Sequence, residues 1–125
     1  MAPYPARPIA DWFIARAKRD GEFLTQMKLQ KLVYIAHGWH LAIYGTALIS
    51  ESIEAWRWGP VIRSLYRDFA DFGSLPIIIS SDVVRLPTLE EFLEAIWTKY
   101  GGHTAAQLST MTHSPGTPWS SVYSP

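Results

Sequence analysis

The four histidines are the side chains in this sequence best suited to bind a metal ion. His37 and His40 are three residues apart in a predicted helix, a spacing that can direct two imidazoles at one metal. His103 and His113 flank another predicted helix, but an HExxH spacing is missing. The alternative is that the histidines are hydrogen-bonded inside a polar layer of the core, because buried polar groups are normally paired. We favour this alternative and expect no bound metal and no cofactor.

Residues for covalent or acid–base catalysis are scarce. The chain has no cysteine and no GxSxG motif, and its serines lie mainly in loops rich in proline and glycine. The pair Glu51/Glu54 flanks a predicted strand, and the pair Glu90/Glu91 suits the positive end of a helix dipole. Because a nucleophile, a base and an electrophilic stabiliser cannot be assembled, we expect no catalytic residues and a protein that is not an enzyme.

Aromatic and basic side chains between positions 56 and 67 form the candidate binding site. The alternation of residues predicts a short strand that carries Trp56 and Trp58 on one face. The helix after it can place Arg63, Tyr66 and Arg67 close by, because these three share a helical face. Tryptophan, tyrosine and arginine most often dominate the energy of protein–protein interfaces. We therefore predict a partner-binding surface made of these five residues.

Two other interpretations of the same region remain open. The tryptophans could be core anchors, or Lys28, Lys31 and Arg57 could join them in a basic, aromatic surface for nucleic acid. Eleven basic residues balance eleven acidic ones, so the chain lacks the overall positive charge typical of nucleic-acid-binding proteins. The charge balance favours a protein partner, and Lys28 with Lys31 is the next candidate for its binding surface.

Length and composition indicate one folded domain over residues 1–125, with an N-terminal extension at 1–7 and a C-terminal tail at 114–125. The chain is 48% hydrophobic and has no cysteine, so it can build a core but no disulfides. The N-terminus lacks the pattern of a secretory signal, and no apolar run is long enough to cross a membrane. We therefore expect a cytoplasmic protein.

Periodicity and capping residues predict an α+β fold that is mostly helical, with a central buried helix and a small β-sheet. The expected elements are helices at 8–20, 25–44, from 59–60 onward, 88–100 and from 104 onward, a strand within 47–58 and a hairpin within 77–86. Thr88 and Glu91 form one expected capping box, and Thr104 with Gln107 forms another.

The helix at 25–44 is apolar on most sides, which is typical of a helix at the centre of a fold. Thr25 is a good N-cap, and Gly45 is the expected end. Its polar N-terminal residues Gln26, Lys28, Gln30 and Lys31 suggest that this end is solvated. The stripe expected to face the core consists of Leu29, Leu32, Val33, Ala36, His40 and Ile43.

Several ordered motifs together resemble the SocA/GepA-like antitoxins, the Panacea domain family. The matching pieces are Met27-Lys-Leu-Gln-Lys-Leu-Val-Tyr34, His37-Gly-Trp39, Glu54-Ala-Trp-Arg-Trp-Gly-Pro60, Leu65-Tyr-Arg67, Gly73, and Leu108-Ser-Thr-Met-Thr-His113 followed by Pro118-Trp119. The resemblance spans nearly the whole chain, and its specificity lies in the ordered combination.

This resemblance implies a small cytoplasmic protein of a toxin–antitoxin pair, often encoded by prophages, that neutralises its cognate toxin by direct binding. The type member acts as a proteolytic adaptor that presents its toxin to the ClpXP protease. No catalytic residues follow from the resemblance, and the oligomeric state stays open. The alternative function is a phage or prophage regulatory protein that binds another protein or nucleic acid.

Overall fold

The computed structural model describes residues 3–57, 59–79 and 85–113 of the chain. Within these ranges the fold is α+β and mostly helical, as predicted from the sequence. In chain order the elements are α1 (Ala6–Arg19), α2 (Gln26–Tyr44), β1 (Ile53–Trp56), β2 (Gly59–Ile62), α3 (Arg63–Asp68), the 3₁₀ helix η1 (Ala70–Phe72), α4 (Glu90–Tyr100) and α5 (Ala105–His113). None of the helices in the described ranges is long and apolar enough to cross a membrane.

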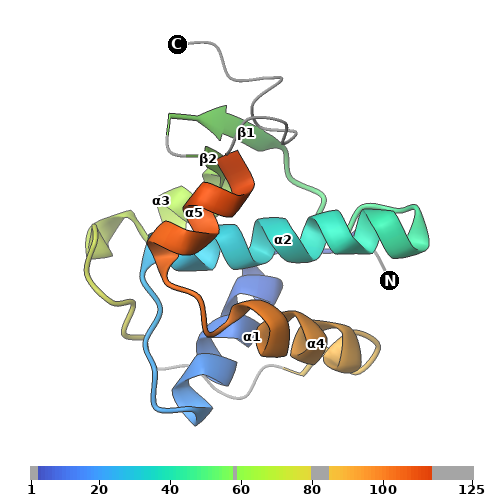
Figure 1. The fold of residues 1–125 in the computed structure, drawn as a ribbon, viewed down its shortest axis with the longest axis horizontal. Coiled ribbons are helices and arrows are strands. Elements are labelled where there is room, and N and C mark those ends of the chain that lie inside the picture. The colour runs from blue at the N-terminus through green and yellow to red at the C-terminus, as the bar shows by residue number, and fades with distance from the viewer. Residues whose placement is uncertain (1–2, 58, 80–84, 114–125) are drawn as a thin grey trace.

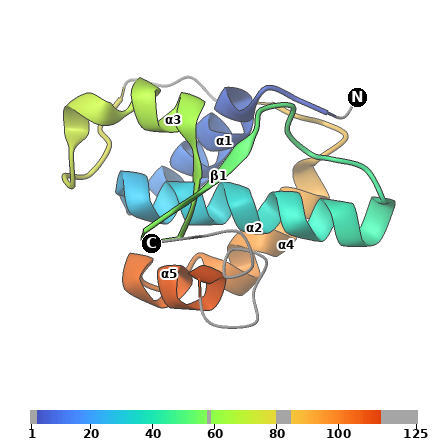
Figure 2. The ribbon, with the colours of Figure 1, turned by 90° about the horizontal axis from the view of Figure 1, so that it is seen from above.

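Helix α2 runs across the middle of the molecule, with α1 and α4 below it and the β1–β2 hairpin above it in Figure 1. The Thr25 side chain caps its N-terminus by accepting from the Lys28 N–H at 3.4 Å, and Gly45 ends it at φ 71°. Seen from above in Figure 2, β1 crosses over α2, and α3 lies near α1. The predicted central position of this helix is confirmed.

The predicted core stripe of α2 is correct except at its end. Five of its six members are buried: Leu29, Leu32, Val33, Ala36 and His40. Ile43, however, is 57% exposed, and so are its neighbours in the last turn, Leu41 and Tyr44, at 43% and 58%. The expectation for Ile43 was wrong because this last turn projects beyond the packed core, which a periodic sequence pattern cannot reveal.

The segment Gly59-Pro60 begins a second strand, and the expectation that it begins a helix was wrong. β1 and β2 pair antiparallel, with Ile53 opposite Ile62 and Trp56 opposite Gly59. Gly59 has φ 119°, a conformation that favours glycine and lets the chain reverse. Pro60 is tolerated because a two-stranded sheet leaves one side of each strand unpaired, so a missing N–H on that side costs no ladder bond. Helix α3 therefore starts only at Arg63.

The hairpin expected within 77–86 is not formed by its first run, Ile77–Ile79, which is not a strand. Ile77 is fully buried, and its N–H donates to the Leu24 carbonyl at 2.7 Å. The Ile77 N–H is thus bonded to the segment before α2 and is not available to pair with a second strand of a hairpin. Of the second run, Val83 and Val84 lie outside the described residues, and Arg85 and Leu86 are not in a strand.

One of the two expected capping boxes is formed. At α5, Thr104 and Gln107 exchange side-chain-to-backbone hydrogen bonds of 2.8 and 3.1 Å. At α4, Leu89 is the N-cap residue, and no side chain caps it. The Thr88 hydroxyl instead lies 3.1 Å from the Tyr4 hydroxyl. The Thr88 side chain therefore bonds to Tyr4 and does not cap α4.

Candidate partner-binding surface

Trp56 and Tyr66 form an aromatic pair at the junction of the hairpin and α3. Their ring centroids are 4.9 Å apart, with the planes tilted by 59°. Glu54 ties the pair to its surroundings, because it accepts from the Trp56 indole at 2.9 Å and pairs with the Arg63 guanidinium at 3.3 Å. The structure therefore brings Trp56, Arg63 and Tyr66 into one cluster, as their spacing predicted.

The residues of this region that the structure describes differ in their exposure. Tyr66 is 44% exposed, the Arg63 side chain is 60% exposed, and Arg67 is exposed one helical turn after Arg63. Trp56 is half-buried, so it both packs against the molecule and presents part of its ring. Trp58, the fifth predicted member, lies outside the described residues. We call Trp56, Arg63, Tyr66 and Arg67 the partner surface.

The outer edge of β2 is held by two side chains of α2. The Gln30 amide donates to the Ile62 carbonyl at 3.1 Å and accepts from the Ile62 N–H at 2.8 Å, as a neighbouring strand would. One residue later, the Lys31 ammonium donates to the Pro60 carbonyl at 2.9 Å. These bonds satisfy the buried edge of the strand and fix the hairpin on α2.

The polar N-terminal end of α2 is therefore mostly buried and not solvated, and Lys28 and Lys31 do not form an exposed basic patch. Lys31 is only 2% exposed, and Gln26 and Gln30 are also buried. Lys28 donates to the carbonyl of Gly101, at the end of α4, at 2.6 Å. The expectation was wrong because these polar side chains bind backbone groups far along the chain. This also gives a structural reason for the Lys-Leu-Gln-Lys part of the motif.

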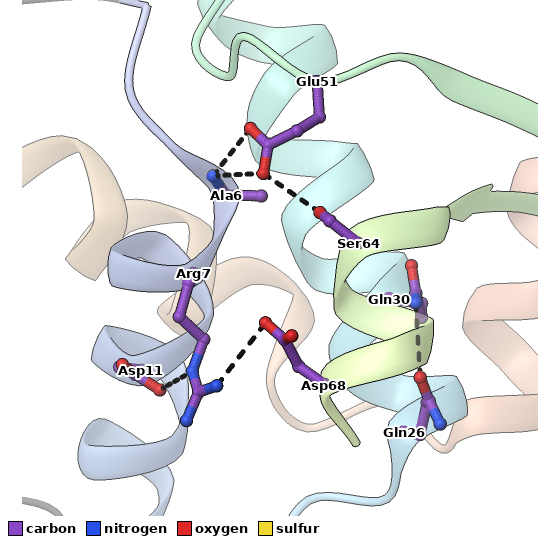
Figure 3. Close-up of polar contacts among 8 residues, drawn as sticks. All are labelled: Ala6, Arg7, Asp11, Gln26, Gln30, Glu51, Ser64 and Asp68. Carbon is purple, nitrogen blue, oxygen red and sulfur yellow. Dashed lines mark hydrogen bonds and ion pairs between the residues drawn. The ribbon is translucent and has the colours of Figure 1, made fainter. Parts of the chain in front are cut away.

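Helix α3, which carries most of the partner surface, is positioned by the Glu51 carboxylate. Glu51 accepts from the Ala6 N–H at 2.9 and 3.1 Å and from the Ser64 hydroxyl at 3.0 Å, so it caps α1 and holds α3 at once (Figure 3). Arg7 adds an ion pair with Asp68 at 3.4 Å. The sequence does not reveal this role of Glu51, since the N-terminus that it caps is 45 residues away.

A largely apolar groove of about 500 Å³ lies beside the partner surface. Trp56, Val61 and Tyr66 form one part of it, and Met27 and Lys31 of α2 form another. The other described residues that line it are Thr25, Gln26, Gln30, Arg57, Gly73, Ser74 and Ala105. The groove thus joins the N-terminal end of α2 to the hairpin and α3, with a buried lysine in its lining.

Burial lowers the pKa of Lys31 from 10.5 to about 8. The folded chain therefore releases this proton more easily than the unfolded chain, and stability should rise with pH between about 8 and 10.5. We expect the free energy of unfolding to rise by roughly 1 kcal/mol per pH unit from pH 8 to 9.5, relative to Lys31→Met. Burial raises the pKa of Tyr34 above its ordinary value of 10.0, which acts in the opposite direction at higher pH, so the comparison stops at 9.5.

Urea unfolding of both proteins at pH 7, 8, 9 and 9.5 would measure this difference. Parallel stability curves for the wild type and Lys31→Met would show that Lys31 titrates in the folded chain as it does in the unfolded chain. The experiment also shows whether Lys31 is buried in solution. An exposed lysine has the same pKa in the folded and unfolded chains, so the stability difference would not change with pH in this range.

The two histidines of α2 bind the loop that follows the helix. His40 Nδ1 lies 2.7 Å from the Thr46 carbonyl, and the ring packs against Tyr44 and Phe92 at centroid distances of 4.7 and 5.7 Å. His37 Nδ1 accepts from the Ile49 N–H at 3.4 Å, and burial, with a smaller contribution from His40, lowers the pKa of His37. The interpretation of His40 as a hydrogen-bonded core residue is confirmed. Among the described residues no three potential ligands come together around a metal position.

Comparisons with known proteins agree with the pattern of motifs. The family model described as "Antitoxin SocA-like, Panacea domain" matches residues 29–120, which include most of α2, the hairpin and α3. Antitoxin SocA of Caulobacter vibrioides (strain NA1000 / CB15N) is 32% identical over 127 residues, which cover 91% of this chain and 68% of that protein. No solved structure matches.

Proposed function

The chain belongs to the SocA-like antitoxins with a Panacea domain, and we propose that it neutralises its cognate toxin by binding it directly through the partner surface. Membership supports an antitoxin role in a toxin–antitoxin system. The observation that supports the direct-binding step is the Trp56–Tyr66 pair with Arg63: Tyr66 and Arg63 are exposed, Trp56 is half-buried, and Glu54 holds Trp56 and Arg63 in place. Neutralisation by binding requires no catalytic group.

The physical argument for this surface rests on pre-organisation. Tryptophan, tyrosine and arginine contribute most to binding when their side chains are already fixed before the partner arrives, because less conformational freedom is lost. Here the hairpin is fixed by Gln30 and Lys31, and α3 is fixed by Glu51. The exposed side chain of Met27, which lines the adjoining groove, extends the area that a partner could cover.

Delivery of the bound toxin to the ClpXP protease is a second step of the proposal. It is supported only by the resemblance to the SocA/GepA-like antitoxins, whose type member acts in this way. Binding and delivery are separable, because an antitoxin that blocks its toxin needs no protease, whereas an adaptor requires one.

Co-expression with the toxic protein encoded beside this chain tests both steps. We expect the wild-type chain to restore growth and to co-purify with that protein. The same experiment in cells that lack ClpX separates the steps: rescue that persists indicates neutralisation by binding alone, and rescue that is lost while the complex still forms indicates delivery. Rescue without any complex of the two purified proteins would contradict direct binding.

A further inference from the structure

The groove beside the partner surface contains a buried cation whose hydrogen-bonding capacity is mostly unused. Lys31 is only 2% exposed, and its ammonium group has three hydrogen-bond donors. Only the Pro60 carbonyl, at 2.9 Å, accepts from it among the described residues. None of the ion pairs between described residues involves Lys31. A buried lysine without a carboxylate partner is uncommon and costly.

The lining of the groove is complementary to an anion with apolar neighbours. Among the described lining residues, the charged ones are Lys31 and Arg57, and none is acidic. Glu54, the acidic side chain bound to the neighbouring Trp56, is already paired with Arg63. Met27, Trp56 and Tyr66 supply apolar walls, and methionine adapts easily to the shape of a partner.

We propose that this groove accepts a glutamate or aspartate side chain of the bound toxin, with the carboxylate against the Lys31 ammonium and apolar residues of the same segment against Met27, Trp56 and Tyr66. This inference rests on the proposed function, since the toxin is the partner that brings the acidic segment. A polypeptide fits better than nucleic acid, because a phosphate backbone requires several spaced cations and the whole chain has a net charge of zero.

A carboxylate would supply the acceptors that the ammonium lacks and would stabilise its charged form. Burial lowers the pKa of Lys31 to about 8, so binding of the acidic side chain should raise this pKa and take up a proton above pH 8. The other titratable residues in the described lining are Arg57 and Tyr66. Affinity for the acidic segment should therefore fall as the pH rises from 7 to 9.5.

Two matched tripeptides test the chemistry directly: acetyl-Leu-Glu-Leu-amide and acetyl-Leu-Gln-Leu-amide. Binding to the full chain is followed by the ¹³Cε signals of labelled lysine. We expect the glutamate peptide to bind about tenfold or more tightly than the glutamine peptide, because hydrogen bonds between charged groups are the stronger ones. It should also raise the pKa of Lys31, and this wild-type measurement holds even if a variant fails to fold.

Lys31→Met removes the ammonium group and keeps the apolar stem, so it should abolish the preference for glutamate. Lys18→Met, at an exposed position on α1, is the matched control and should keep the preference. Equal affinity for both peptides, no binding of the glutamate peptide, or tighter binding of the oligonucleotide d(T)10 would each overturn the inference. A chain that rescues cells from the toxin but shows no glutamate preference keeps the proposed function and loses only this inference.

Discussion

Leu32→Ala should lower the free energy of unfolding by roughly 2–5 kcal/mol, through lost transfer energy and the cavity that remains. Leu32 is fully buried in the middle of α2, next to Lys31, whose ammonium holds the hairpin. Its loss therefore weakens the element on which the other helices and the hairpin are packed. Urea unfolding monitored by tryptophan fluorescence measures the change.

Leu41→Ala provides the matched control, because it makes the same chemical change on the same helix. Leu41 is 43% exposed, so its removal leaves no closed cavity and should cost less than about 1 kcal/mol. Similar losses for the two variants would mean that the rotation of α2 about its axis is wrong. A loss far below 2 kcal/mol for Leu32→Ala would mean that α2 is not the central helix.

The helices were predictable because their signals are local. Periodic apolar residues, the Thr25 cap and Gly45 identify α2, and reciprocal bonds between Thr104 and Gln107 start α5 as predicted. The second strand was not predictable in the same way. Gly59-Pro60 suits the start of a helix as well as a strand after a turn. Hydrogen bonds from the Gln30 amide and the Lys31 ammonium to carbonyls of this segment favour the strand.

The roles of the buried polar residues depend on partners that are distant in sequence. Gln30 binds Ile62, 32 residues later, and Glu51 binds the N–H of Ala6, 45 residues earlier. A polar side chain near a helix end normally indicates solvent, so no local pattern revealed these contacts. The cluster of Trp56, Arg63 and Tyr66 was predictable, because strand alternation and helical spacing both operate over a few residues. Its attachment through Glu54 was not predicted.

Arg63→Ala combined with Arg67→Ala should abolish rescue from the toxin while the melting temperature stays nearly unchanged. Both side chains are exposed on α3. The only ion pair lost among the described contacts is that of Arg63 with Glu54, and surface ion pairs contribute little stability. Arginines at an interface, in contrast, can each contribute roughly 2 kcal/mol or more of binding free energy when the partner buries them fully.

Lys18→Ala combined with Arg19→Ala is the matched control, since it also removes two exposed positive charges, here at the end of α1. It should rescue as the wild type does. Loss of rescue in both double variants would indicate that overall charge, and not the partner surface, decides neutralisation. A large drop in melting temperature for the α3 variant would point to an effect on folding.

Calorimetric titration of the purified toxin into the chain tests direct binding through the partner surface most directly. The wild type should show saturable binding, and the folded Arg63→Ala/Arg67→Ala variant should bind about a thousandfold more weakly, which corresponds to the loss of two interface arginines at about 2 kcal/mol each. If the folded variant binds the toxin as tightly as the wild type, the toxin binds elsewhere on the molecule and the partner surface is assigned wrongly.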